Sequence, residues 1–214
     1  MLNANDVASV ILSRSGKWLD SMRLQKLLYY VQSWHLAITD EPLFPEHFKA
    51  YINGPVVPQV WHERKDRATR RPAHQNLAGI DVDELSSAII DEVLAMYGSL
   101  TGDELSALTH TERPWVEARA GVPEGAPSSE PLSERSMARF YRAHRTLGGR
   151  TAADLAAGGV HPGVDSMHAD PIDIDAILAS IPDAPTADQW GGANLVPPRQ
   201  GSAPLANQRV YPEN

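Results

Sequence analysis

The segment Tyr51–Trp61 reads Tyr-Ile-Asn-Gly-Pro-Val-Val-Pro-Gln-Val-Trp, and its two prolines leave the backbone little freedom. Each proline fixes its own φ at about −65° and disfavours helical geometry in the residue before it. Gly54 can adopt the positive φ that a tight corner requires, and Pro58 suits the first turn of a helix. The segment therefore predicts a stiff corner between a short extended run and the start of a helix. Such a corner can shape a core without carrying any chemistry.

A strongly apolar helix is expected shortly before this corner. Between residues 24 and 38, apolar side chains and one histidine recur at the i, i+3, i+4 spacing of a helix that is packed on one side. These positions are Leu24, Leu27, Leu28, Val31, His35 and Ile38. Tyr29, Tyr30 and Trp34 widen the same face. We interpret the helix as central to the core, with an aromatic binding surface as the alternative.

Most of the other periodic segments up to residue 148 are also helical in pattern. Helix caps precede apolar residues at helical spacing at Asn5-Asp6, at Asp81 or Asp83, and at Ser133. The run from Phe44 to Ile52 alternates between apolar and other residues, which indicates a short strand. The predicted fold class is mainly α, a compact helical domain with a short extended or β segment near residues 44–57.

The composition argues against several classes of protein. The chain has 214 residues and no cysteine, which excludes disulfides and thiolate catalysis and fits a reducing compartment. The first residues lack a basic region before an apolar stretch, and no uncharged apolar run is long enough to span a bilayer. We therefore expect a soluble, cytoplasmic protein that has no membrane partner. The formal net charge of −8 argues against a protein that relies mainly on neutralising nucleic-acid phosphate.

Residue patterns for catalysis, cofactor binding or metal binding are missing from the sequence. Ser106 and His110 are one helical turn apart without an orienting acid, and there is no cysteine nucleophile. The glycine pair Gly148-Gly149 lacks the Lys-Ser/Thr of a phosphate loop, and no His-X-X-X-His pair places two ligands on one helix face. We expect no enzyme activity and no catalytic, cofactor-binding or metal residues.

The composition changes at residue 149. Residues 149–214 contain eight of the seventeen prolines and are mostly acidic, so we predict a flexible acidic tail after a helical domain at 1–148. One short helix is expected near residues 171–181, because Asp170 can cap it and Pro171 can occupy its first turn. Its apolar stripe consists of Ile174, Ile177, Leu178 and Ile181. A helix this short needs a surface to pack against, either the protein's own core or a groove on a partner.

Two further features allow a structural or a binding interpretation. A basic connector between residues 63 and 74 carries Arg64, Arg67, Arg70 and Arg71, and it is either a solvated loop or a clamp for an acidic protein surface or a phosphate backbone. His110 either hydrogen-bonds carbonyls at a helix end, where a positive ring also suits the helix dipole, or contacts a partner.

Four sequence blocks occur in a distinctive order. They are Leu-Gln-Lys-Leu-Leu-Tyr-Tyr at 24–30, Gly-Pro-Val-Val-Pro at 54–58, Tyr97-Gly98, and Leu-Thr-His at 108–110 followed by Pro114-Trp115. In this order they resemble the Panacea-domain family, the SocA- and GepA-like antitoxins of bacteria and their phages. The resemblance covers about residues 4–120. It implies that 1–148 is a Panacea-like domain and that the chain neutralises a cognate protein toxin by direct contact.

The resemblance leaves the mode of action open. At least one member of the family behaves as a proteolytic adaptor that presents its toxin to an ATP-dependent protease. That protease is therefore an alternative partner, and a nucleic-acid-binding regulator is the third hypothesis. From the charges and apolar stripe described above, we predict partner contacts at Arg64, Arg67, Arg70, Arg71, His110, Ile174, Ile177, Leu178 and Ile181.

Overall fold

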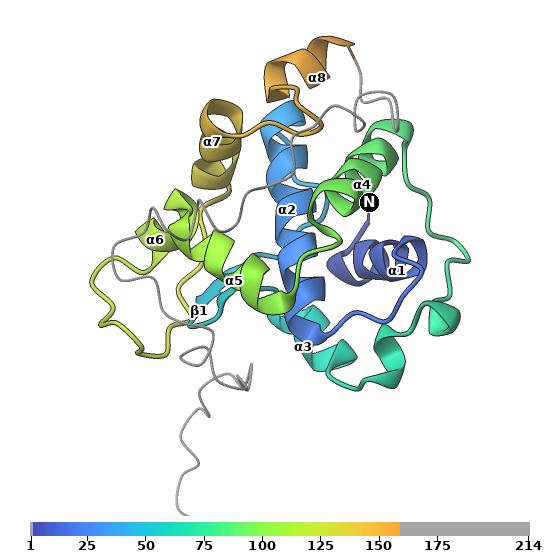
Figure 1. Ribbon diagram of the computed structural model, residues 1–214, viewed down its shortest axis with the longest axis horizontal. Helices are drawn as coiled ribbons and strands as arrows, with labels where there is room; N and C mark the ends of the chain where they lie inside the picture. Colours follow the sequence, from blue (N-terminus) through green and yellow to red (C-terminus); the bar gives the residue numbers. More distant parts are fainter. Residues whose placement is uncertain (1, 159–214) are drawn as a thin grey trace, which may run out of the picture.

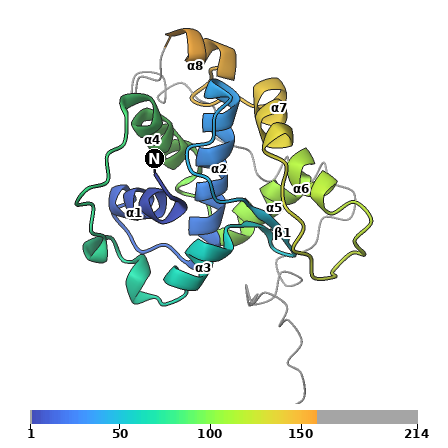
Figure 2. The ribbon, with the colours of Figure 1, turned by 180° about the vertical axis from the view of Figure 1, so that it is seen from behind.

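The computed structural model describes residues 2–158, and one central helix organises them. The helix α2 (Ser21–Thr39) is flanked by other helices on both sides, as the two opposite ribbon views show (Figures 1 and 2). All residues from Leu24 to Ala37 are buried. A helix that is buried on every side must be covered by packed neighbours all round, so α2 is the axis of the core.

Seven further α-helices and two short 3-10 helices occur in the described residues. They are α1 (Ala4–Arg14), α3 (Pro58–Arg64), α4 (Glu84–Tyr97), α5 (Gly102–Thr111), α6 (Arg113–Ala118), α7 (Glu134–His144) and α8 (Ala152–Gly158), with the 3-10 helices η1 (Ala68–Arg70) and η2 (Pro72–His74). The helices α1 and α4 lie on one side of α2, and α7 lies on the other (Figure 1). The mainly α fold class is confirmed.

Side-chain caps fix several of the helix starts. Asp83 and Ser133 cap α4 and α7, as predicted. The cap of α1 is Asn3 rather than Asn5-Asp6. Its side-chain oxygen accepts hydrogen bonds from the backbone N–H groups of Asn5 and Asp6, and the Asp6 carboxylate accepts one from the backbone of Asn3. This reciprocal pair starts the helix before the position that the sequence indicated.

The predicted extended segment is a small antiparallel hairpin. Strand β1 (Lys49–Tyr51) pairs with strand β2 (Gly54–Val56), with Tyr51 opposite Gly54 and a two-residue turn between them. Gly54 has a φ of +95°, and Pro58 is the first residue of α3. The predicted corner geometry is therefore confirmed.

A second segment from far along the chain lies against β1. The backbone N–H of Ala50 donates to the carbonyl of Glu130, and the N–H of Leu132 donates to the carbonyl of Phe48. These bonds cover the edge of β1 that β2 does not pair with. Strand β1 is thus hydrogen-bonded to β2 on one edge and to the segment that leads into α7 on the other.

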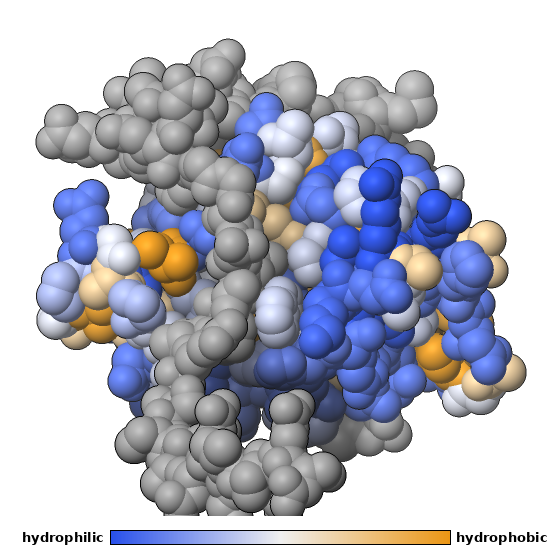
Figure 3. All heavy atoms as spheres, turned by 90° about the horizontal axis from the view of Figure 1, so that it is seen from below, coloured by the Kyte–Doolittle hydropathy of each residue, from blue (hydrophilic) through white to orange (hydrophobic). Residues whose placement is uncertain are grey.

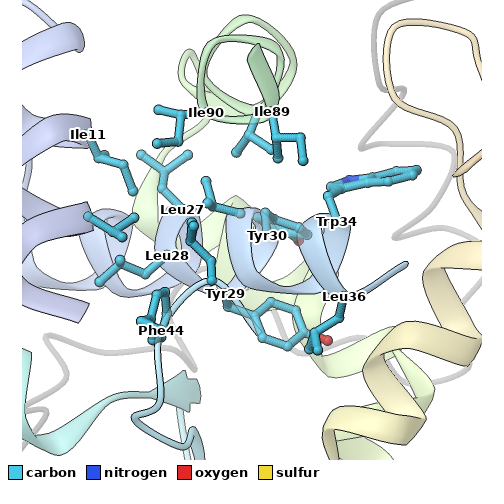
Figure 4. Packing of buried hydrophobic residues seen from close by; sticks show 14 of the residues in the cluster. Ile11, Leu27, Leu28, Tyr29, Tyr30, Trp34, Leu36, Phe44, Ile89 and Ile90 are labelled. Carbon is cyan, nitrogen blue, oxygen red and sulfur yellow. The ribbon is translucent and has the colours of Figure 1, made fainter. Parts of the chain in front are cut away.

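The core gathers around the inner turns of α2. Figure 4 shows Leu27 of α2 close to Ile11 of α1 and to Ile89 and Ile90 of α4. On the α7 side, the rings of Trp34 and Tyr141 meet edge to face at a centroid distance of 5.4 Å. Tyr29, Tyr30 and Trp34 are all buried, which confirms the core interpretation of this aromatic group.

Packing continues beyond residue 148, where the sequence analysis ends the helical domain. Ala152 and Leu155 of α8 are buried, and α8 packs against α2 and α7. The packed structure therefore extends to Gly158. The predicted helix near 171–181 lies outside the described residues and stays a prediction.

The face of the described part that is seen from below is mostly hydrophilic. Seen from below, hydrophobic residues form only small separate groups among the hydrophilic ones (Figure 3). The exposed large hydrophobic residues are Ile52, Leu77 and Val116. Among residues 2–158, none of the helices has the combination of length and apolar character that crossing a membrane requires.

Candidate functional site

A buried carboxylate lies at the junction of α5 and α6. Glu112 is 1% exposed, and its Oε2 accepts hydrogen bonds from the hydroxyl groups of Tyr29 at 2.9 Å and Tyr141 at 2.8 Å. A guanidinium nitrogen of Arg145 lies 3.5 Å from Oε1 of the same carboxylate. These four residues, which we name the Glu112 cluster, join α2, the α5–α6 junction and the end of α7.

Burial governs the electrostatics of the Glu112 cluster. Loss of solvent raises the pKa of Glu112, while Arg145 and the two phenol donors oppose that shift by stabilising the charged form. Burial and then the neighbouring Glu112 charge raise the pKa of Tyr29 well above its ordinary value. Because the phenols stay protonated, they remain donors to the carboxylate.

A buried lysine lies under the Gly-Pro corner. Lys26 is 0% exposed, and its Nζ donates to the carbonyl of Pro55 at 3.3 Å. Burial lowers the pKa of Lys26 to about 7, although Asp20 acts in the opposite direction. A Cβ at Gly54 would lie 2.7 Å from Cε of Lys26 and 2.6 Å from Oγ1 of Thr109. Only glycine lets the hairpin approach α2 and α5 this closely.

Two neutral side chains hold the backbone of the same corner. Oε1 of Gln25 accepts from the N–H of Val57 at 2.8 Å, and its Nε2 donates to the carbonyl of the same residue at 3.4 Å. The hydroxyl of Ser106 donates to the carbonyl of Asn53 at 3.0 Å. The corner is therefore fixed by side chains from both α2 and α5.

An aromatic stack ties α5 and α6 to β1. The rings of His110 and Trp115 are stacked with centroids 3.9 Å apart and planes 13° apart. Nε1 of Trp115 donates to the carbonyl of Tyr51, and the guanidinium of Arg119 lies 5.0 Å from the Trp115 ring centroid. Burial, followed by the positive charges of Lys26 and Arg119, lowers the pKa of His110 to about 3. The lowered pKa favours a neutral ring over the positively charged ring considered in the sequence analysis.

The first sequence block contacts the other three through its side chains. Tyr29 reaches Glu112 between the two parts of the fourth block, and Lys26 and Gln25 reach the second block. Tyr30 stacks on Tyr97 of the third block with ring centroids 4.0 Å apart. The blocks are thus one interlocked network around α2. Its ionisable groups are sealed from solvent, so the network is suited to fixing the arrangement of the helices.

The connector between α3 and α4 uses two of its arginines internally. Arg64 donates to Asn5 and Ser9 of α1 and to Gln75. Arg70 is buried and donates to the hydroxyl of Ser21 and to backbone carbonyls near the end of α3. These contacts direct both guanidinium groups into the fold, although the buried Nε of Arg70 has no hydrogen-bond partner.

The other two arginines of the connector face outward. Arg67 lies over the ring of Trp18, with its guanidinium carbon 4.4 Å from the ring centroid, and Arg71 is exposed. The structure therefore does not gather the four predicted arginines into one open basic surface. The remaining predicted contacts, Ile174, Ile177, Leu178 and Ile181, lie outside the described residues.

Several residues of the buried network were not identified from the sequence. Lys26 has a recognisable signal, because it precedes Tyr29 and Tyr30 by three and four positions and so shares their helix face. Glu112 lies between the two parts of the last block and has no signal of its own in the sequence. Its partners Tyr141 and Arg145 come from a distant helix, and no local pattern links them to it.

No group of three or more possible metal ligands gathers within residues 2–158. The Glu112 cluster contains a single carboxylate, and its other members are two phenols and a guanidinium. Phenol and guanidinium groups that already donate to that carboxylate leave it little capacity to hold a cation. The site is therefore a buried, hydrogen-bonded cluster that fixes the positions of the helices around it.

Comparison with known proteins identifies this region. Residues 24–116 match a family model described as antitoxin SocA-like, Panacea domain. No curated protein and no solved structure matches the chain. The matched range begins at the first sequence block and ends just after Trp115 of the last one, so it spans the corner, the lysine and Glu112. The resemblance found in the sequence is confirmed over residues 24–116, which match the model of the SocA-like Panacea domain family.

Proposed function

We propose that the chain is an antitoxin that neutralises a cognate protein toxin by direct binding, and that it is not an enzyme. The observation that carries this proposal is the match of residues 24–116 to an antitoxin-like family. The name of that family implies a toxin as partner in general. The absence of cysteine fits action in the reducing cytoplasm, which is where we place it.

The chemistry of the interior supports a binding role. Lys26, Tyr29 and Glu112 are the groups of the matched region best suited to acid–base work, and none is more than 1% exposed. A substrate could reach them only if α2, α5 and α7 separated. The network therefore favours a rigid scaffold whose outer surface meets the partner.

The direct test is expression of the neighbouring open reading frame with and without this protein. We expect growth arrest when the neighbour is expressed alone, growth when both are present, and co-purification of the two proteins as a complex. Absence of toxicity, or rescue without a complex, would overturn the proposal.

The protease alternative needs a separate arm. The same rescue assay is repeated in a host that lacks its ATP-dependent proteases, with the toxin level followed by immunoblot. We expect rescue and a stable toxin level, because sequestration needs no degradation. Rescue that disappears in this host would show that the chain acts as an adaptor and that direct neutralisation is wrong.

A point substitution tests whether His110 is a partner contact. We expect His110→Ala to retain rescue wherever its melting curve stays close to that of the parent, because the ring is occupied by stacking on Trp115. Complete loss of rescue with unchanged melting would instead identify His110 as a functional contact.

A further inference from the structure

An open groove lies between the end of α2 and the outer face of α7. Its volume is about 630 Å³. Its apolar part consists of Leu36, Ala138 and Ala143, and its basic part consists of Arg135, Arg139 and Arg142. The two alanines leave room between the arginines, so an apolar side chain could lie between guanidinium groups.

The groove follows one stripe of α7. Its residues on this helix, at positions 135, 138, 139, 142 and 143, have the i, i+3, i+4, i+7, i+8 spacing of one helix face. Met137 and Tyr141 occupy the opposite, buried face. The stripe spans about 12 Å along the helix axis. A partner helix of two to three turns matches this length.

The arginines of this stripe differ in how far acidic groups of the fold neutralise them. Arg142 is already paired with Asp40 at 2.7 Å and donates to the carbonyl of Ala37. Arg139 lies 3.6 Å from a carboxylate, that of Glu117, which Arg113 approaches more closely at 2.6 Å.

Arg135 is exposed and forms no ion pair within the described residues. The acidic residue of α7 beside it, Glu134, also lines the groove but accepts from His47 at 3.2 Å. Arg135 and Arg139 therefore form a basic end of the groove that acidic groups of the described fold satisfy only in part.

The sequence after Gly158 contains a segment with complementary spacing. Asp170, Asp173, Ile174, Ile177, Leu178 and Ile181 follow i, i+3, i+4, i+7, i+8, i+11. On a helix, the carboxylates would precede the aliphatic groups along a single face. Residues 159–214 contain seven carboxylates and two arginines, so they carry five of the eight net negative charges of the chain. The acidic segment and the basic groove thus have opposite charge.

The connection is long enough to bring the two together. The described structure ends at Gly158 in α8, which packs directly against the two helices that form the groove. The twelve steps from there to Asp170 reach up to about 40 Å when extended. A tether of this length gives an effective concentration on the order of millimolar, so even a weak contact is populated.

We propose that this groove is the docking site of the chain's own segment Asp170–Ile181. The acidic first turn of the segment meets Arg135 and Arg139, and the aliphatic residues lie over the alanines of α7. The segment then covers the outer face of α7, and any acidic partner of that face has to displace it. The inference does not depend on the proposed function, and its test requires no toxin.

Because the chain has no cysteine, a disulfide can form only between cysteines that are introduced for a cross-linking test. In the full chain, Ala143→Cys is combined with Ser180→Cys, which leaves the four aliphatic anchors intact. The matched control combines Ser180→Cys with Ala73→Cys, an exposed alanine on η2, which packs against α1. The helices α1 and α7 lie on opposite sides of α2 (Figure 1). We expect the intramolecular disulfide to form at least ten times faster in the groove pair, at a rate independent of protein concentration. Equal rates for the two pairs, or a disulfide between chains, would overturn the proposal.

Charge reversal provides the second arm. Asp170→Arg with Asp173→Arg should lower the groove-pair rate to that of the control, and it alters no described residue. Arg135→Glu with Arg139→Glu should have the same effect, with the melting curve recorded to verify folding. Combining the two reversals should restore fast cross-linking, because the opposite charges are exchanged. Failure to restore it in a folded protein would show that the charges do not direct the docking.

Discussion

The Glu112 cluster and the connector of residues 63–74 both place charged side chains among backbone groups, but they join very different parts of the chain. Tyr29 and Glu112 are 83 positions apart in sequence, and both are buried. In the connector, Arg70 donates mainly to carbonyls five and six positions away. The first region fixes the mutual position of helices, whereas the second mostly shapes a surface loop.

This difference shows where buried polarity is needed in a helical fold. An apolar contact allows two helices to slide, while a buried carboxylate with three donors accepts one arrangement only. In the connector, Arg64, Arg67 and Arg71 are partly or fully exposed, so water can replace the bonds they make. Substitutions should therefore lower the free energy of unfolding strongly in the cluster and only slightly in the connector.

The largest effect is expected for Glu112→Ala. It leaves two buried phenol donors and Arg145 without their acceptor, so we expect a loss of about 3–5 kcal/mol in the free energy of unfolding. Urea denaturation followed by circular dichroism measures it. Glu124→Ala, at an exposed loop carboxylate, is the control and should change stability by less than about 0.5 kcal/mol. Similar losses for both substitutions would remove the distinction between cluster and surface.

The corner next to Lys26 comes second. Gly54→Ala should cost about 2–4 kcal/mol, because it combines positive φ with a clash against Thr109 and Lys26. Gly16 has a φ of +65° with nothing within 4 Å of a built Cβ, so Gly16→Ala isolates the backbone strain at about 1–2 kcal/mol. If both variants lost the same free energy of unfolding, the close approach of residue 54 to Thr109 and Lys26 would add no cost of its own.

Lys26 predicts a pH dependence of stability. Its pKa in the folded state is about 7, below the 10.5 of a free lysine, so the unfolded state binds more protons between these values. Stability should therefore rise with pH, by roughly 2 kcal/mol from pH 7 to pH 9. The raised pKa of Glu112 has the opposite effect at lower pH. There the folded state binds more protons than the unfolded state, so stability falls as the pH rises. Lys26→Met should remove the rise, as urea titrations at several pH values can show; a rise that persists in this variant would assign it to another group.

The smallest effects belong to the connector. Arg64→Ala breaks the bonds to α1 and should cost about 1–2 kcal/mol. Arg71 is exposed, so Arg71→Ala should stay within about 0.5 kcal/mol of the parent. Thermal melting of the two variants side by side makes the comparison. An equal loss for both would show that the connector is held together as one unit.

Local patterns were sufficient to predict the helical architecture and the corner. Helical spacing over residues 24–38 indicated the central helix, and Gly54 with its two prolines indicated the turn before α3. Both depend on neighbours in sequence. The short strands were also indicated, although their pairing with residues 130–132 was not.

The buried network could not be predicted in the same way. Glu112 meets Tyr141 only because α7 returns across α2, and no local spacing encodes that return. The adjacent carboxylates Asp91 and Glu92 look alike in the sequence, yet Glu92 is buried and Asp91 is not. Charge alone also suggested an open basic connector, whereas Arg64 and Arg70 bond inward. The bonds of Tyr141 to Glu112 and of Arg64 to α1 join residues that are far apart in sequence.

The backbone bonds between β1 and residues 130–132 have a consequence for synthesis of the chain. Ala50 leaves the ribosome about eighty residues before Glu130, its partner. At about 5–20 residues per second, this delay is roughly 4–16 s. During that time the free edge of β1 carries unpaired N–H and C=O groups, which can pair with a strand of another chain. The nascent domain is therefore open to edge-to-edge aggregation until residues 130–132 emerge and close it.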